Sequence, residues 1–353
     1  MKALILAGGK GTRLRPITHS IAKQLVPVAN RPVIEYGIEA IRASGITDFG
    51  IIVGDSAQEI KAALGDGSRW GATFTYIPQS EPLGLAHAVK TAHPFLDDSK
   101  FIMYLGDNLI KGGVAELVED FQSGECDASI LLTHVDNPSE FGVAELDGER
   151  VVRLEEKPKQ PKSDLALVGV YLFNPSVFDA IETLKPSFRG EYEITDAIQT
   201  LLDWGKTVRY QIVTGWWKDT GTVEAILDAN RLLLQDIERR ISGEVSDSTI
   251  EGNCVIESGA RVVGSTIRGP AIIGAGCVVE NSYVGPFTSV DSGTRILGSE
   301  IEYSIVMQDC TIRDVPARLS TSLIGRGVIV DKSDGTPKTA RLVLGDASSV
   351  TFA

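Results

Sequence analysis

The sequence predicts two architectures in one chain of 353 residues: an α/β domain with a mostly parallel sheet, followed by a parallel β-helix. Two observations carry this prediction. In the first two-thirds, short apolar segments typical of buried strands alternate with segments of helical periodicity, the pattern of a sheet covered by helices. In the last third, aliphatic residues recur at steps of five or six residues with a composite period of 17, which indicates a solenoid.

The α/β pattern runs from the first residues to about residue 243. After Phe141 the alternation of strands and helices gives way to two short apolar segments around Asp147-Gly148, a turn signal. This pattern predicts a β-hairpin of 143–146 and 151–154. The final helix is expected to carry one apolar stripe and to end at Gly243 as its C-terminal cap. The remaining expected strands are 2–7, 49–53, 72–77, 101–105, 128–133, 167–173 and 207–213, and the expected helices are 31–43, 57–64, 84–93, 113–123 and 223–241.

The repeat of the last third has two columns. Valine or isoleucine stands at 250, 256, 262, 267, 273, 279, 284, 290, 296 and 301, and the residue two positions earlier is small each time. Residues two apart point to the same side of a strand, so both columns face inward. An antiparallel sandwich would not keep this fixed phase. The repeat resembles the left-handed, hexapeptide type of β-helix, and its handedness rests on that resemblance. We expect a catalytic domain at 1–243, the β-helix at 244–335 and a capping segment at 336–353.

The composition narrows the class of protein. The formal net charge is −13, which argues against a general nucleic-acid binder. No apolar run reaches 18 residues, and Gly8-Gly9-Lys10-Gly11 interrupts the N-terminal run after five apolar residues, so we expect a cytoplasmic protein without a membrane span. The four cysteines show no CxxC spacing, which argues against a zinc site or a disulfide framework.

The charge is unevenly distributed. Residues 1–34 contain six basic and no acidic residues, which leaves −19 on the other 319. This cationic stretch holds Leu6-Ala7-Gly8-Gly9-Lys10-Gly11-Thr12-Arg13-Leu14, a glycine-rich segment directly after the first strand. Glycines allow the backbone to approach a ligand closely, and successive N–H groups can hold phosphate oxygens. The segment is neither a Rossmann fingerprint nor a Walker A motif. With Arg13 and Lys23 it is a candidate triphosphate site.

GGKGTRLRPIT followed by AKQLVPVANRP resembles the signature of the sugar-1-phosphate nucleotidylyltransferases, most closely the long members that use glucose 1-phosphate and dTTP. The resemblance covers essentially the whole chain. It implies transfer of a nucleoside monophosphate from dTTP to glucose 1-phosphate, release of pyrophosphate, and use of Mg²⁺. It also implies that Arg13 and Lys23 are catalytic and that the nucleotide is bound by Leu6, Ala7, Gly8, Gly9, Gly11, Thr12, Gln24, Gln79 and Gly84.

Two aspartates are candidate metal ligands. Asp107 and Asp219 each follow an expected strand, where ligands bind in open α/β sheets. Two carboxylates with phosphate oxygens suit Mg²⁺. Asp219 could instead cap the following helix. The resemblance implies the metal role, and it assigns the sugar phosphate to Asn108, Gly142, Glu156, Lys157, Val168 and Glu191.

Three alternatives stay open from the sequence. Hexapeptide β-helices are often acyltransferases, which generally use a histidine base; the four histidines here all precede the β-helix. A regulatory subunit would not need Arg13, Lys23, Asp107 and Asp219 together. UTP could replace dTTP, and another sugar 1-phosphate could replace glucose 1-phosphate, although Gln24 favours thymidylyl or uridylyl transfer. We expect a homo-oligomer with no nucleic-acid or membrane partner.

Overall fold

A computed structural model describes residues 1–332 and 345–351 of the protein. Contacts within the chain divide it into two units, which are described separately. The first unit comprises residues 1–10, 21–25 and 33–219. The second comprises 11–20, 26–32 and 220–353. Among the described residues, no helix combines the length and apolar character needed to cross a membrane.

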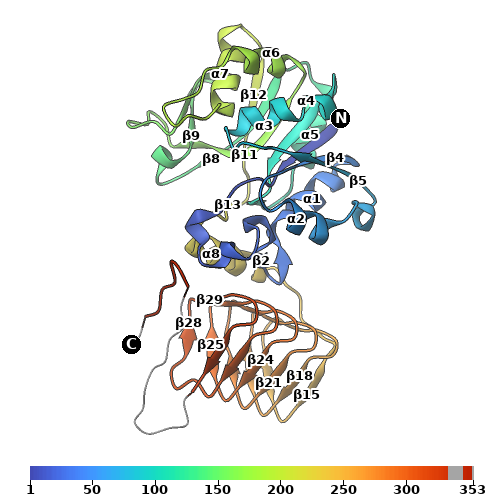
Figure 1. Cartoon of the computed structure of the whole chain (residues 1–353), viewed down its shortest axis with the longest axis vertical. Helices are drawn as coiled ribbons and strands as arrows, with labels where there is room; N and C mark the ends of the chain where they lie inside the picture. Colours follow the sequence, from blue (N-terminus) through green and yellow to red (C-terminus); the bar gives the residue numbers. More distant parts are fainter. Residues whose placement is uncertain (333–344, 352–353) are drawn as a thin grey trace. The chain divides into compact units, whose positions relative to one another are not determined.

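The first unit is built on a nine-stranded sheet (Figure 1). Its main path is β10-β9-β11-β6-β1-β4-β5, and β8 joins β11 to β12. Strands β6, β1, β4 and β5 are parallel, while β11 runs antiparallel to β6, β8 and β9. A separate ribbon pairs β7 with β13. The strands are β1 (Lys2–Leu6), β4 (Asp48–Val53), β5 (Thr73–Pro78), β6 (Phe101–Leu105), β7 (Asn108–Ile110), β8 (Ala128–His134), β9 (Gly142–Asp147), β10 (Arg150–Glu156), β11 (Leu165–Phe173), β12 (Val208–Ile212) and β13 (Trp217–Asp219).

Helices cover both faces of this sheet. One face forms a core with α3, α6 and α7, where Val89, Val177 and Ile198 are fully buried. On the other face α1 packs against Tyr104 of β6, and a Cβ at Gly37 would lie 2.7 Å from that ring. The α-helices of this unit are α1 (Val33–Ala43), α2 (Ala57–Leu64), α3 (Leu85–Thr91), α4 (His93–Leu96), α5 (Ala115–Ser123), α6 (Ser176–Thr183) and α7 (Ile194–Asp203), and its short 3-10 helices are η3 (Lys23–Leu25), η4 (Ser68–Trp70) and η5 (Pro138–Glu140).

The second unit contains stacked coils of short parallel strands, so the predicted fold class is confirmed (Figure 1). The strands form three parallel sheets, and partners in most of the stack are 17 residues apart, as between Ile250 and Ile267. Both inward columns are buried from Cys254 and Ile256 onward, while Ser248 and Ile250 in the first coil are partly buried. The strands are β14 (Arg240–Ile241), β15 (Glu244–Ser246), β16 (Thr249–Glu251), β17 (Cys254–Ile256), β18 (Arg261–Val263), β19 (Thr266–Arg268), β20 (Ala271–Ile273), β21 (Val278–Glu280), β22 (Tyr283–Val284), β23 (Thr288–Val290), β24 (Arg295–Leu297), β25 (Glu300–Glu302), β26 (Ile305–Val306), β27 (Thr311–Arg313), β28 (Leu319–Ser320), β29 (Leu323–Ile324) and β30 (Ile329–Asp331).

Three serines of the small-residue column also form hydrogen bonds between successive coils. The Ser265 hydroxyl accepts a hydrogen bond from the N–H of Ser282 (3.1 Å), and the Ser282 hydroxyl accepts one from Ser299 (3.2 Å). The Ser299 hydroxyl accepts the next from Val315 (3.1 Å). The column therefore connects successive coils and satisfies N–H groups inside the solenoid, which an alanine could not do.

The last helix is shorter than predicted. Helix α8 spans Val223–Leu234, so the expected extension to Ile241 and the cap at Gly243 are wrong. Residues 240–241 instead form β14, which pairs with Val255 and Ile256 of the first full coil. The apolar periodicity continues because Leu234 and Ile237 pack on Val255 and Ile272 of the solenoid. The apolar spacing therefore continues past the end of the helix because residues on both sides of that end pack on the same surface of the solenoid.

A buried amide joins α8 to two other parts of the second unit. Asn230, fully buried, accepts hydrogen bonds at Oδ1 from the N–H of Ala29 (2.8 Å) and the hydroxyl of Ser289 (2.9 Å). It donates from Nδ2 to the carbonyl of Phe287 (3.1 Å). The hairpin of β2 (Pro27–Val28) and β3 (Arg31–Pro32) therefore belongs to this unit, as do the short helices η1 (Thr12–Leu14) and η2 (Ile17–His19). The expected domain boundary at 243 remains a prediction, and most of the expected cap lies outside the described residues.

Candidate active site

The glycine-rich segment leaves the central strand of the sheet. Ala7 donates its N–H to the carbonyl of Ile52 (2.8 Å), and the N–H of Gly106 reaches the carbonyl of Leu6 (3.0 Å), so β1 ends between β4 and β6. Leu6 and Ala7 are buried. A Cβ at Gly9 would lie 2.8 Å from the Cε of Lys23. A side chain at position 9 would therefore displace the lysine, which explains the glycine there.

Lys23 and Asp107 form an ion pair beside this turn. Their side chains keep only 19% and 10% of their accessible surface, so the pair is largely withdrawn from water. Gln24, in the same short helix, is 1% exposed, and its Oε1 is buried without a hydrogen-bond partner among the described residues. A buried acceptor of this kind requires an explanation, and a bound ligand supplying a donor is one.

The second aspartate reaches the same place through the two-stranded ribbon. Asp219, the last residue of β13, pairs with Asn108, the first residue of β7 and the neighbour of Asp107. The Asn108 Nδ2 donates to Asp107 (3.3 Å), and the indole N–H of Trp217 donates to the Asn108 Oδ1 (2.5 Å). The ribbon therefore brings the two predicted aspartates to neighbouring positions from segments 112 residues apart.

These residues fit a magnesium ion that is completed by substrate. Mg²⁺ is usually held by one or two carboxylates with phosphate and water oxygens. Asp107 and Asp219 bring two carboxylates to neighbouring strand ends of the ribbon. Both are oxygen donors of the kind that Mg²⁺ prefers, and they would leave the other positions to phosphate and water oxygens.

The residues expected to contact the base follow β5. Gln79 donates from Nε2 to the carbonyl of Gly84 (3.4 Å) and is 3.0 Å from Nδ1 of His87. Gly84 has φ 106°, and a Cβ there would lie 2.8 Å from the N of Tyr192. The backbones on either side are joined by the Tyr192 N–H to the Leu83 carbonyl (2.7 Å). Only glycine fits this close approach.

Three of the residues expected at the sugar, Gly142, Glu156 and Lys157, lie at the end of β10 where it pairs with β9. Glu156 ends β10 opposite Gly142, and the Thr195 hydroxyl donates to Glu156 Oε2 (2.7 Å). A Cβ at Gly142 would lie 3.0 Å from the same oxygen. Lys157 follows with φ 44°. Val168 is buried within a bulge of β11.

The resemblance places the segment 189–195 near the sugar and phosphates, but it does not show what the Arg189 cation contacts. Arg189 contacts three carboxylates, those of Glu156 (3.4 Å), Glu191 (3.1 Å) and Glu193 (3.4 Å). Burial raises the pKa of the Glu193 carboxyl, although the Ser187 hydroxyl stabilises its charged form. The RGEYE segment contains these residues, but only the fold shows that Arg189 reaches back to β10. Glu156 is therefore held from two sides.

Three predicted residues belong to the second unit. Gly11, Thr12 and Arg13 continue the glycine-rich segment into η1, with Gly11 at φ 60°. The hydroxyl of Thr18 donates to the Gly11 carbonyl (2.6 Å) and fixes this turn. Their roles stay predictions from the sequence.

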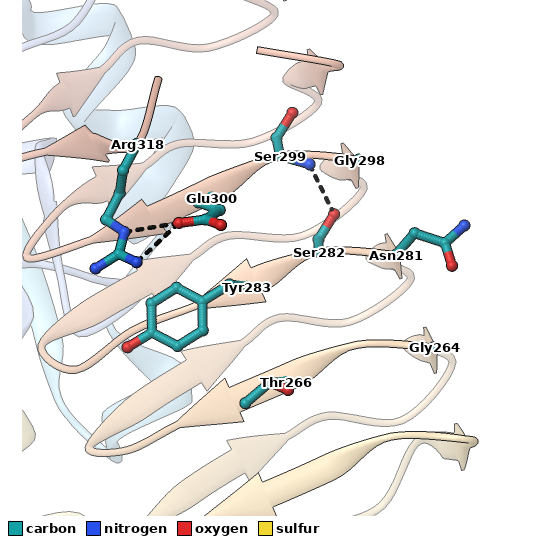
Figure 2. Close-up of a pocket in the computed structure, with 9 residues that line it drawn as sticks. All are labelled: Gly264, Thr266, Asn281, Ser282, Tyr283, Gly298, Ser299, Glu300 and Arg318. Atoms are coloured by element: carbon teal, nitrogen blue, oxygen red, sulfur yellow. Dashed lines mark hydrogen bonds and ion pairs between the residues drawn. The ribbon is translucent and has the colours of Figure 1, made fainter. Parts of the chain in front are cut away.

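A pocket of about 420 Å³ lies elsewhere, on the outside of the β-helix. Figure 2 shows Arg318 tied to Glu300 there, at 2.8 Å, and its guanidinium also lies 4.8 Å from the Tyr283 ring centre. The pocket holds none of the predicted site residues.

Comparison with known proteins agrees with this geometry. Residues 2–236 match the family model described as nucleotidyl transferase. The chain is 57% identical to glucose-1-phosphate thymidylyltransferase of Streptomyces antibioticus over 99% of both chains, and 55% identical to the Streptomyces griseus protein of that name over 99% of this chain and 98% of the other. A solved Bacillus anthracis structure, assigned as a glucose-1-phosphate thymidylyltransferase with bound sucrose, is 39% identical with a TM-score of 0.63, covering 68% of this chain and 97% of the other. The chain is an enzyme that belongs to the nucleotidyl transferase family.

Proposed function

We propose that this protein transfers a thymidylyl group from dTTP to glucose 1-phosphate and releases pyrophosphate. One observation carries the proposal: Lys23 and Asp107 form a nearly buried ion pair against Gly9 of the glycine-rich turn. A cation fixed at that point would stabilise the charge that develops at the α-phosphate of a bound triphosphate. The names of the full-length relatives support the choice of substrates.

The reaction needs charge placement more than proton transfer. A phosphate oxygen of the sugar 1-phosphate attacks the α-phosphorus, and the bond from that phosphorus to the pyrophosphate oxygen breaks. The nucleophile is already an anion, so no general base is required. Lys23 would stabilise the charge that develops on the α-phosphoryl oxygens, while the N–H groups near Gly8 and Gly9 would hold the triphosphate. For Arg13, Gly11 and Thr12, a role toward the phosphates rests on the resemblance alone.

Asp107 and Asp219 would hold a magnesium ion. When bound, such an ion neutralises phosphate charge and orients the triphosphate. Lys23 also contacts Asp107. The lysine therefore holds the carboxylate in position before substrate arrives.

The sugar phosphate would bind at the other side of the ribbon. Glu156 would accept hydrogen bonds from the sugar hydroxyls, since Thr195 and Arg189 fix its carboxylate. Lys157 would meet the phosphate. Asn108, Gly142, Val168 and Glu191 complete the subsite as proposed from the resemblance.

The test is a pyrophosphate-release screen of all nucleoside triphosphates against several sugar 1-phosphates, with Mg²⁺. We expect the highest kcat/KM for dTTP with glucose 1-phosphate. A strong preference for UTP would move the assignment to uridylyl transfer. Absence of pyrophosphate release with every pyrimidine triphosphate would overturn the proposal.

We also propose a role for the β-helix and a cellular location for the enzyme. The β-helix contains no histidine, so residues 245–353 are assigned to stability and self-association and not to acyl transfer. Light scattering of the full chain should give a multiple of 37.9 kDa, and a monomer mass would contradict self-association. The enzyme is proposed to work in the cytoplasm, as its substrates require.

A further inference from the structure

The amide of Gln79 is held in one orientation by two acceptors. Its Nε2 is 3.4 Å from the carbonyl oxygen of Gly84 and 3.0 Å from Nδ1 of His87. A carbonyl oxygen can only accept, so the atom facing Gly84 must be the NH₂ group. Both of its hydrogens then have acceptors if His87 is neutral and carries its proton on Nε2.

This arrangement leaves one atom of the amide for a ligand. Gln79 Oε1 faces the glycine-rich turn, where a Cβ at Gly8 would lie 3.6 Å from it. Among the described residues, no group donates a hydrogen bond to this oxygen. The fixed amide therefore offers an acceptor, and no donor, beside the proposed triphosphate site.

An acceptor at this point distinguishes between pyrimidines. Thymine and uracil carry a hydrogen on N3, which can donate to Oε1. Cytosine has a lone pair on N3, which would face the lone pairs of Oε1. A mismatch of this kind leaves two acceptors opposed in a partly buried site and is strongly disfavoured.

We propose that His87 is a positioning residue for base specificity: its Nδ1 holds the Gln79 amide so that only a pyrimidine with an N3–H donor is accepted. This rests on the proposed function, because a pyrimidine nucleotide is the proposed substrate and the resemblance assigns Gln79 to the nucleotide. His87 lies in the first turn of α3, anchored by the helix and by its ring, whose centre is 6.5 Å from that of Tyr192. The histidine acts through Gln79 and does not need to touch the base.

Two substitutions of His87 distinguish the effect of its hydrogen-bond acceptor from the effect of its aromatic ring. His87→Phe keeps an aromatic ring beside Tyr192 but has no acceptor. His87→Asn loses the ring but can place Oδ1 where Nδ1 lies. We expect His87→Phe to raise KM for dTTP and UTP about tenfold, the factor that corresponds to one neutral hydrogen bond. KM for glucose 1-phosphate and kcat should stay close to those of the unchanged enzyme.

The decisive readout is the ratio of kcat/KM for dTTP to that for dCTP. With His87→Phe only the longer contact with the Gly84 carbonyl (3.4 Å) still holds the amide. The amide can then rotate and donate to cytosine N3, so this ratio should fall at least tenfold. His87→Asn should keep the ratio within about threefold of the unchanged enzyme. An unchanged ratio in His87→Phe would overturn the inference, and so would an equal loss in both variants, which indicates a structural role.

The experiment distinguishes failure of the proposed function from failure of the proposed role of His87. If the unchanged enzyme releases no pyrophosphate from dTTP or UTP, the proposed function is wrong before any variant is compared. If it does and the variants do not differ, only the role of His87 is wrong. Thermal melting of both variants shows whether either is folded, and a misfolded His87→Phe would leave His87→Ala to be measured against His87→Asn in the same way.

Discussion

Replacing Lys23 with alanine removes the cation from the centre of the proposed site. The lysine ammonium pairs with Asp107, and the two side chains are 19% and 10% exposed. Removing one preorganised donor from a transition state typically lowers kcat by about 10²–10³, or about 2.7–4 kcal/mol. We expect a loss of this size in pyrophosphate release at saturating dTTP, glucose 1-phosphate and Mg²⁺.

The same substitution should also lower stability, for a reason that can be separated from catalysis. Without Lys23 the Asp107 carboxylate keeps the hydrogen bond from Asn108 (3.3 Å) but loses the ion pair with the lysine. Breaking a buried pair from one side costs about 3–5 kcal/mol, and the remaining exposure of both groups places this pair near about 3 kcal/mol. Adding Asp107→Asn removes the carboxylate charge that faced the lysine. The double variant should regain most of the stability and none of the activity.

Lys10→Ala is the matched control. Its side chain is 61% exposed and lies 4.0 Å from a carboxylate oxygen of Asp55, which is itself 90% exposed. Pairs of this kind contribute about 0–1 kcal/mol. Urea unfolding should therefore separate the two lysines clearly. Folded Lys23→Ala with turnover within tenfold of the unchanged enzyme would refute the catalytic reasoning, and a stability loss that Asp107→Asn does not restore would refute the ion-pair reasoning.

Four other predictions follow from the described contacts. Asp107→Asn and Asp219→Asn should each raise the Mg²⁺ concentration for half-maximal activity, and the double variant should be no worse than the poorer single one if they share an ion; additive effects would contradict this. Gly84→Ala should cost about 1–3 kcal/mol in a thermal melt, because φ is 106° and a backbone nitrogen lies 2.8 Å from the new Cβ; an unchanged melting temperature would argue against this strain. Ser282→Ala should lower the free energy of unfolding by about 1–3 kcal/mol, because the N–H of the next coil loses its acceptor at 3.2 Å, and urea titration measures it. Burial raises the pKa of Glu193 above its ordinary 4.5, so its contribution to stability is complete below pH 4.5 and is lost as pH rises through the higher folded value. Glu193→Gln should flatten that decline in unfolding measured from about pH 4 to pH 7, and equal slopes would contradict it.

The β-helix could be predicted from sequence almost position by position. Its strands are short, and each inward residue is set by local alternation and by a period that the chain itself displays, as at Ile267 and Val284. Apolar spacing could not show where the helix before the solenoid ends and the first short strand begins. The apolar stripe of α8 passes Leu234 without a break, but the chain there turns to pair β14 with β17, so spacing alone placed the end seven residues late.

In the proposed active site, too, some residues could be predicted from the sequence and others could not. The glycine turn, Lys23 and the aspartates stand out in the sequence because residue type and position after a strand carry the signal. The contacts of Arg189 with Glu156 and of Gln79 with His87 do not. They join segments through the pairing of β9, β10 and β11 and through the turn before α3, and a charged or polar side chain gives no sign in sequence of which distant partner it will meet. Tertiary structure alone decides the orientation of these groups, because that orientation depends on neighbours brought together by the sheet.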